Sequence, residues 1–473
     1  MSRLLRLRGI AIRALITLLI VPIMTSINST IAKAMEGGAL PESAEPAESA
    51  EPAGAVEETI QRVTKTDITL YTEYKDFQIE FIYIEGVPYT ATYESSNQSV
   101  ATVSSEGVIT PIKVGKATIT VVISLYGSEY VETITVNVKN RTDAEKKWDK
   151  TVIKWKDKTI EKLVREILSK PSGNITAKDV SDITTLDLYS KKIKSIEDIK
   201  YFTNLESLNL IDNQIIDISS LKGLTKLTWI DLRSNQIIDI ISLKGLTNLT
   251  QLFIAYNQIE NISSLQELTN LTYLDLYLNK ISDINSLKTL TSLKWLDIRE
   301  NKINDFSPII KLSNLTNIGL NCNKASDLQI LKGFPNLIDL NLYNSNISDI
   351  SFIKDLPKLT NLNLAGNQIK DISLLKGLTK LNNLELSGNQ ISNISSIKGL
   401  TKLTFLDLSY NKIKDISSLN GLKNLEYLSL SNNQISNISS LKGLTKLAQL
   451  YLSNNTIKDW TPVKNISNVI GRP

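Results

Sequence analysis

The sequence predicts a multidomain protein, in which a small all-β sandwich precedes a helical cap and a curved solenoid with a parallel β-sheet on its concave face. Three observations carry this prediction. Leucine and isoleucine recur every 22 residues over 183–468, short alternating apolar runs occupy 63–140, and an amphipathic helical stretch fills 141–182. An unbroken period of this length means that each unit buries its apolar face only against its neighbours.

Thirteen units of 22 residues fill 183–468 and predict a leucine-rich-repeat solenoid. In each unit a Leu-x-Leu segment is expected to form a short strand whose leucines point inward, while the residues between them point out onto the concave face. Three positions later comes Asn in eleven units, where its side chain is suited to bond backbone groups of two adjacent turns. We expect these residues to form a structural ladder: Asn213, Asn235, Asn257, Asn279, Asn301, Asn323, Asn367, Asn389, Asn411, Asn433 and Asn455.

The ends of the chain are predicted to lie outside these domains. In residues 1–34, Arg3, Arg6 and Arg8 precede an apolar run from Ala14 to Met24, and a small-x-small site ends at Ala34, which together indicate a secretory signal peptide. We expect cleavage after Ala34 and no transmembrane span afterwards; an uncleaved anchor is the alternative. Residues 35–62 are rich in Glu, Ala, Pro and Ser and should form an extended acidic linker, and 469–473 form a short tail.

Composition excludes several classes of function. The signal peptide carries five basic residues and no acidic one, which leaves 48 basic against 49 acidic residues, so phosphate-driven nucleic-acid binding is not expected. The chain has no histidine and one cysteine, Cys322, which excludes Cys/His zinc sites and Ser-His-Asp or Cys-His catalysis. We expect no metal and no cofactor.

Residues 63–140 show apolar residues with period two, broken by turn residues, which favours an antiparallel sandwich. The sequence from Tyr93 to Val103, together with Gly107 and the run from Gly115 to Val121, resembles the bacterial Ig-like domains (group 2) of surface proteins. This resemblance implies a spacer module, with adhesion as the alternative.

The cap and repeats carry a second resemblance. Residues 160–168 place apolar side chains on one helical face, and Thr176 with Asp179 reads as a capping box that begins a second helix. The sequence of residues 179–188, followed by repeats such as 213–221, is similar to that of the internalins. Internalins are bacterial surface or secreted proteins, of which several bind host receptors. Here the Ig-like segment precedes the cap, whereas internalins typically place one after the repeats. No Leu-Pro-x-Thr-Gly sorting signal is seen, so retention at the envelope is expected to be non-covalent.

The outward strand positions are the candidate ligand-binding residues, because folding does not dictate them. Repeats two to five place aromatic residues there, with arginine and acidic residues around them, which is the composition of a protein-binding hot spot. The alternative explanation for these aromatic residues is that β-strands favour aromatic side chains whether or not they bind a ligand. The predicted binding residues are Trp229, Asp231, Arg233, Phe253, Tyr256, Tyr273, Asp275, Tyr277, Trp295, Asp297 and Arg299.

Two further features of this face are weaker. Phe405, Asp407, Tyr410, Tyr427 and Tyr451 form a second candidate cluster. In addition, the short side chains of Gly319 and Ala325 are expected to leave a dip beside Trp295, with Cys322 at its edge.

The predicted function is that of a secreted or envelope-associated binding or adhesion protein for a macromolecular ligand, such as a protein on a host or neighbouring cell. Carbohydrate binding by the same aromatic residues is one alternative, and a structural envelope protein that self-associates is another. Asp275 and Asp297 are expected to lie one strand spacing apart, near the geometry of a retaining glycosidase pair. A shallow open face offers no water-excluding pocket to raise the pKa of one carboxyl group, so we expect no enzyme.

Overall fold

The computed structural model describes residues 66–72, 77–79, 89–125, 128–321, 325–466 and 468–472. The chain divides into two compact units, Met1–Asn140 and Arg141–Pro473. The expected signal peptide and linker lie outside the described residues, as do Cys322 and Asn323. Among the residues that are described, no helix has the length and apolar character needed to cross a bilayer.

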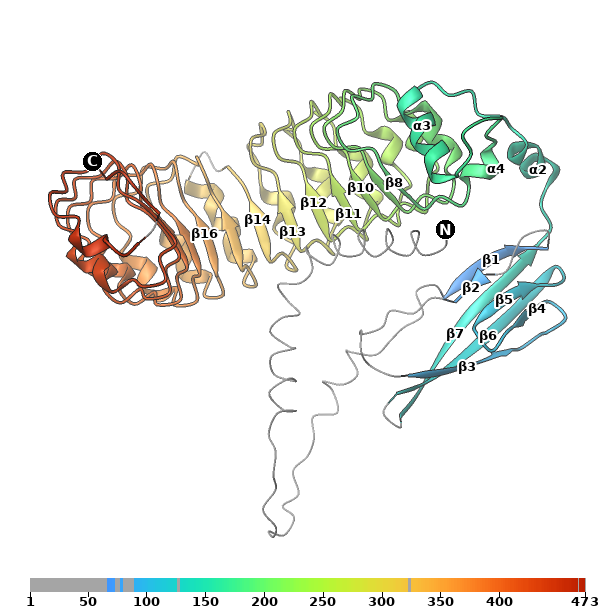
Figure 1. The fold of residues 1–473 in the computed structure, drawn as a ribbon, viewed down its shortest axis with the longest axis horizontal. Coiled ribbons are helices and arrows are strands. Elements are labelled where there is room, and N and C mark those ends of the chain that lie inside the picture. The colour runs from blue at the N-terminus through green and yellow to red at the C-terminus, as the bar shows by residue number, and fades with distance from the viewer. Residues whose placement is uncertain are drawn as a thin grey trace, which may run out of the picture. The chain divides into compact units, whose positions relative to one another are not determined.

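The N-terminal unit is a sandwich of two β-sheets around one apolar core (Figure 1). Ile109 from one sheet and Ile119 and Ile134 from the other are buried in this core. One pairing departs from the predicted antiparallel arrangement: β1 and β7 are parallel, which two strands far apart in sequence can adopt because no hairpin joins them. The sheets have the orders β1-β7-β6-β3 and β2-β5-β4, with β1 Asp67–Tyr71, β2 Phe77–Gln78, β3 Thr90–Ser95, β4 Ala101–Val103, β5 Val108–Pro111, β6 Gly115–Leu125 and β7 Ser128–Lys139.

Three helices begin the second unit: α2 (Asp143–Asp149), α3 (Lys158–Ile167) and α4 (Ala177–Val180). The expected capping box is present at α4, where the Thr176 hydroxyl accepts from the Asp179 N–H and the Asp179 carboxylate accepts from the Thr176 N–H. Ile160 and Val164 of α3 are fully buried in the same core as the repeats, so the cap closes the apolar end of the solenoid. The buried carboxylate of Asp198 accepts two cap N–H groups and ties the cap to the first repeat.

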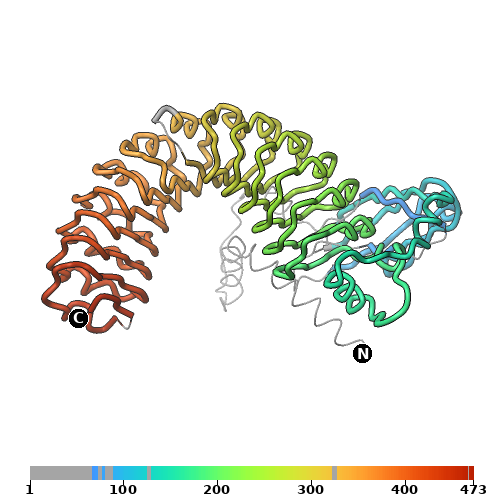
Figure 2. The backbone as a smooth tube through the Cα atoms, turned by 90° about the horizontal axis from the view of Figure 1, so that it is seen from above, coloured from blue at the N-terminus to red at the C-terminus, as the bar shows by residue number. Residues whose placement is uncertain are grey.

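The repeats form one parallel sheet of fourteen strands in sequence order, and Figure 2 shows them following an arc. Each strand pairs with the next in a 22-residue register, so Trp229 lies beside Gln251, and Tyr273 beside Trp295. The predicted tail supplies the fourteenth strand, β21, which pairs with β20. The strands are β8 Thr185–Asp187, β9 Ser207–Asn209, β10 Trp229–Asp231, β11 Gln251–Phe253, β12 Tyr273–Asp275, β13 Trp295–Asp297, β14 Asn317–Gly319, β15 Asp339–Asn341, β16 Asn361–Asn363, β17 Asn383–Glu385, β18 Phe405–Asp407, β19 Tyr427–Ser429, β20 Gln449–Tyr451 and β21 Val469–Ile470.

Short 3₁₀ helices return the chain on the other side of each repeat. Their last apolar residue, such as Leu221 or Leu243, is buried against the same residue of the next repeat. The sheet side is narrower because strands stack at only about 4.8 Å, which places it inside the arc. The 3₁₀ helices are η2 Glu197–Tyr201, η3 Ser219–Leu221, η4 Ile241–Leu243, η5 Ser263–Glu267, η6 Asn285–Thr289, η7 Ser307–Ile309, η8 Ala325–Gly333, η9 Ser351–Asp355, η10 Ser373–Gly377, η11 Ser395–Ile397, η12 Ser417–Leu419, η13 Ser439–Gly443 and η14 Thr461–Val463.

The asparagine column bonds the turns that follow the strands. Asn257 Oδ1 accepts from the Ile237 N–H at 2.9 Å, and its Nδ2 donates to the carbonyl oxygens of Leu232, Ile254 and Ala255 at 3.0, 3.1 and 3.2 Å. The same pattern recurs at all the ladder asparagines that the structure describes: Asn213, Asn235, Asn279, Asn301, Asn367, Asn389, Asn411, Asn433 and Asn455. Each asparagine therefore links its own turn to the preceding one.

Candidate binding surface

Four aromatic rings form a continuous row on the concave face of strands β10 to β13. Ring centroids are 5.8 Å apart for Trp229 and Phe253, 4.6 Å for Phe253 and Tyr273, and 3.9 Å for Tyr273 and Trp295. The last pair is stacked, with 7° between ring planes. Phe253 stands two positions after Gln251, which occupies the column of the other three, and its ring bridges that gap.

A second pair lies beside this row. Tyr256 and Tyr277 meet edge to face with centroids 5.2 Å apart, and Tyr256 is 49% exposed. The Arg299 guanidinium lies over the Tyr277 ring at 5.0 Å, and that of Arg233 lies over Phe253 at 5.1 Å. The structure thus gathers all six predicted aromatic residues on one surface, here called the aromatic patch: Trp229, Phe253, Tyr256, Tyr273, Tyr277 and Trp295.

Each of the two arginines is held by the aspartate that ends the preceding strand. Arg233 Nε and Nη2 donate to both carboxylate oxygens of Asp231, and Arg299 makes the same paired contact with Asp297. Asp231 is 0% exposed, which leaves its carboxylate no accessible surface for a direct contact with a ligand. Its carboxylate lies under the guanidinium and positions it. Asp297, which is 5% exposed, is used in the same way.

Asp275 is the third carboxylate of this surface and has no arginine bonded to it. Its Oδ1 accepts from the Tyr277 N–H at 3.1 Å, and the side chain is buried. Burial raises the pKa of Asp275 to about 6, and the charge of Asp297 adds to the shift. The expectation that an open face would not raise a carboxylate pKa was therefore wrong for Asp275, because burial of this side chain disfavours its charged form. A glycosidase pair is still not assembled, since Arg299 occupies the Asp297 carboxylate.

The predicted dip at Gly319 is filled. A Cβ atom on Gly319 would lie 2.8 Å from both Arg299 Nε and Asp297 Oδ1, so the glycine makes room for that ion pair. The sequence expectation failed because it treated the missing side chain as empty space, whereas the long arginine of the preceding repeat covers it. Cys322 and the Ala325 side chain are outside what the structure describes.

The second cluster of predicted aromatics also forms a row. Phe405 and Tyr427 are stacked with centroids 4.2 Å apart and 5° between planes, and Tyr451 follows at 5.4 Å. Sequence reasoning missed the polar residues that precede this row, above all Asp339, Asn383 and Glu385. The signal was available, because the outward columns of that region contain carboxylates and no basic residue.

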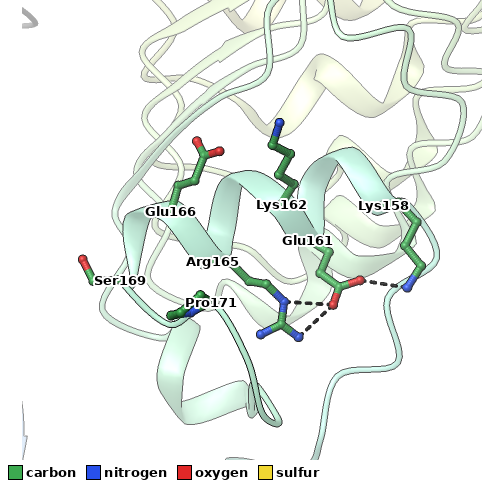
Figure 3. Close-up of a pocket in the computed structure, with 7 residues that line it drawn as sticks. All are labelled: Lys158, Glu161, Lys162, Arg165, Glu166, Ser169 and Pro171. Carbon is green, nitrogen blue, oxygen red and sulfur yellow. Dashed lines mark hydrogen bonds and ion pairs between the residues drawn. The ribbon is translucent and has the colours of Figure 1, made fainter.

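Outside the sheet, a shallow depression lies along the solvent side of α3 (Figure 3). Its central charges are already paired, since Glu161 Oε1 accepts from Arg165 at 2.8 Å and Glu161 Oε2 from Lys158 at 2.8 Å. Such helix-surface pairs are typical of a solvated face. In the described parts of the chain, no group of three or more Asp, Glu, Cys or His residues is arranged to hold a metal ion.

Comparison with known families agrees with both units. The bacterial Ig-like domain (group 2) model matches residues 83–131. Leucine-rich-repeat models match 181–237, 225–267, 247–289, 335–377, 379–421 and 423–465. These models describe repeat and Ig-like modules and indicate no enzyme family. The molecule is thus a bacterial leucine-rich-repeat protein with an Ig-like domain and a helical cap.

Solved structures give the family. An internalin (InlF) of Listeria monocytogenes is 37% identical with a TM-score of 0.59, and the match covers 66% of this chain and 94% of that one. Internalin C2 of the same organism is 26% identical over 63% and 93% of the two chains with a TM-score of 0.22, and the functional domain of its InlJ is 23% identical over 62% and 73% with a TM-score of 0.45. Comparison with curated proteins gives no match. On the likeness to InlF, the chain belongs to the internalin family.

Proposed function

We propose that this internalin is a secreted or envelope-associated binding protein that holds a protein ligand on the aromatic patch of its concave face. The main support for this proposal is the row of four half-buried rings in contact across β10 to β13. Aromatic residues with arginine beside them dominate the energy of protein interfaces. Because the rings pack on one another, they lose little conformational freedom when a ligand covers them.

The charged groups of the patch support the same reading. Arg233 and Arg299 are each fixed by two-point contacts with an aspartate beneath them. A guanidinium held in this way keeps free N–H groups for a ligand and stacks on a neighbouring ring. The patch therefore offers preorganised apolar and donor groups side by side.

Ring orientation favours a protein over a carbohydrate. Carbohydrate-binding aromatics offer a free ring face to the sugar, whereas the faces of Tyr273 and Trp295 cover each other at 3.9 Å. This stacked pair leaves ring edges available, and ring edges carry partial positive charge and suit carbonyl and aromatic groups of a protein. Carbohydrate binding and self-association stay as outcomes of the test below.

Export rests on the first 34 residues. Their basic start, apolar run and small-x-small site are those of a signal peptide, and internalin family membership agrees with an exported protein. The N-terminal sequence of the protein recovered from culture medium or envelope fractions tests this, with a start at Met35 as the expected result.

The binding test uses affinity capture with the exported chain from extracted surface proteins of host and neighbouring cells, followed by Kd measurement on the purified partner. The test variant combines Trp229→Ala, Tyr273→Ala and Trp295→Ala. The matched control combines Ile216→Ser, Ile238→Ser and Ile241→Ser, which remove exposed apolar groups (56, 55 and 59% exposed) away from the sheet. We expect the aromatic variant to weaken binding about 100-fold or more, since hot-spot truncations each cost about 2 kcal/mol.

Equal binding by the aromatic variant, or loss in the isoleucine control alone, contradicts the proposed surface. A glycan array and sedimentation analysis complete the test. Trp295-dependent binding to a sugar with no protein partner would replace the proposal with carbohydrate recognition, and concentration-dependent assembly through the C-terminal edge would replace it with self-association.

A further inference from the structure

The concave sheet changes character after the aromatic patch. Its outward positions from Asn317 to Ser453, all of which the structure describes, carry three carboxylates, Asp339, Glu385 and Asp407, and no lysine or arginine. Beside the aromatic patch, by contrast, two of the three aspartates, Asp231 and Asp297, are each paired with an arginine of this chain. In the second half no such internal partner is present on the outward columns.

Two of these carboxylates are neighbours. Strands β17 and β18 pair so that Glu385 lies beside Asp407, and Asn383 lies beside Phe405. Adjacent parallel strands are about 4.8 Å apart, which places like charges next to each other. Burial raises the pKa of Glu385, and the charge of Asp407 raises it further. The fold thus maintains a charge arrangement that an incoming cation would relieve.

The carboxylates are also oriented. Asn363 Nδ2 donates to Glu385 Oε2 at 2.8 Å, and Ser409 donates to Asp407 Oδ1 through its N–H at 2.9 Å and its hydroxyl at 2.7 Å. Within the described residues, the remaining oxygen of each carboxylate accepts no hydrogen bond. These fixed oxygens need no reorganisation before a donor arrives.

Asn383 supplies an independent observation. Its Oδ1 atom is buried and accepts no hydrogen bond in the described structure. A buried acceptor without a partner costs about 1 to 3 kcal/mol, and rotation of the amide toward an incoming donor would recover this. The unpaired atoms described here on Glu385, Asp407 and Asn383 are therefore all oxygen acceptors.

An aromatic face borders the same group. Phe405 stacks on Tyr427 of β19, and its strand β18 pairs on the other side with β17, the strand of Asn383 and Glu385. A planar cation with several N–H donors fits these surroundings, because it bonds adjacent carboxylates and stacks on a ring at the same time. An ammonium group lacks the planar stack, and the described residues form no metal-ligand cluster.

We propose that Asn383, Glu385, Phe405 and Asp407 form a subsite for an arginine side chain of the protein ligand. The proposal rests on the proposed function and deepens it. Trp295 on β13 and Glu385 on β17 are four strand spacings apart, or about 19 Å. A ligand that fits both surfaces presents an apolar segment and an arginine separated by that span, which about six extended residues cover.

The test uses three labelled peptides, hexaarginine, hexalysine and hexaglutamate, and the exported chain, with Kd measured by fluorescence anisotropy at low salt. The variant E385Q/D407N is compared with E260Q/D355N, which removes the same charge at two exposed positions away from the sheet face. We expect hexaarginine to bind the wild type about tenfold more tightly than hexalysine, and E385Q/D407N to lose about tenfold while the control stays within about twofold. The substitutions keep side-chain shape, and a melting curve for each variant verifies folding.

A second readout is specific to the site. The ¹³C signal of the Glu385 carboxylate, assigned with E385Q, should show a lower pKa when hexaarginine is present, because a bound cation stabilises the ionised form. Equal hexaarginine affinity for wild type and E385Q/D407N, or an unmoved Glu385 titration, overturns the proposal. Because these probes do not require the natural ligand, failure here leaves the aromatic-patch test untouched, and failure of the aromatic variant to weaken ligand capture leaves this result untouched.

Discussion

Replacement of Asn257 by alanine tests how the repeats are held together. The Leu232 carbonyl accepts from both Asn235 and Asn257, and the Ile254 carbonyl accepts from both Asn257 and Asn279. These carbonyls therefore keep one partner in the variant. The Ile237 N–H differs, since its bond to Asn257 Oδ1 is the one the structure gives it.

The expected cost follows from this inventory. One buried N–H left without a partner costs about 1 to 3 kcal/mol, and the carbonyls that lose one of two donors add about 0.5 to 1 kcal/mol each at most. We therefore expect Asn257→Ala to lower the free energy of unfolding by about 2 to 4 kcal/mol. The effect should be largest in the turn of residues 233–237, which loses its link to the next repeat.

The assay is urea denaturation combined with amide hydrogen exchange. Asn304→Ala is the matched control, because Asn304 is exposed and makes one bond, at 3.4 Å, to the carbonyl of Lys302. Exchange at the Ile237 amide should accelerate in Asn257→Ala and stay unchanged in the control. A urea midpoint equal to that of wild type, or an Ile237 amide still protected from exchange, would show that the asparagine column does not stabilise the repeats as described.

Three further predictions concern other positions. Because burial raises the pKa of Asp275 from its ordinary value of 3.8 to about 6, the folded state holds this proton more tightly than the unfolded chain, and stability should fall as pH rises from about 4 to about 6. Asp275→Asn should remove this dependence of the unfolding free energy on pH and stabilise the protein at pH 7.5 by up to about 3 kcal/mol, as measured by urea denaturation across pH. An unfolding free energy that falls with pH more steeply in the variant than in wild type would contradict the assignment. Gly319→Ala should cost about 1 to 3 kcal/mol by displacing Arg299, while Gly377→Ala, where nothing lies within 4 Å, should be close to neutral in thermal melting; equal effects would argue against the filled space. Thr176→Ala should cost about 1 kcal/mol through loss of the α4 cap and Thr176→Ser much less, and equal melting temperatures for the two would refute the capping role.

Much of the repeat architecture could be predicted from the sequence. A constant 22-residue period fixes which residues pair across strands, so the neighbours of Trp229 and Tyr273 follow by counting. The capping box at Thr176 is local and depends on two side chains three residues apart. Such features need no knowledge of how distant side chains fill space.

The side-chain packing at the site could not be predicted, because it depends on how distant side chains fill space. Whether Phe253 bridges the gap above Gln251, and whether Arg299 covers Gly319, depends on how long side chains lean between columns. The burial of Asp231 and the raised pKa of Asp275 follow from that packing. The parallel pairing of β1 with β7 is likewise a tertiary contact that the alternating pattern does not encode.

Hydroxyl-radical footprinting of the protein with its captured ligand is the most direct test of the concave face as the binding surface. Oxidation of Trp229, Phe253, Tyr273 and Trp295 should fall when the ligand is bound, while Trp148 in the cap, which is 38% exposed, should react as before. Unchanged oxidation of the four rings, together with protection on the cap or on the 3₁₀ side of the repeats, would contradict the account.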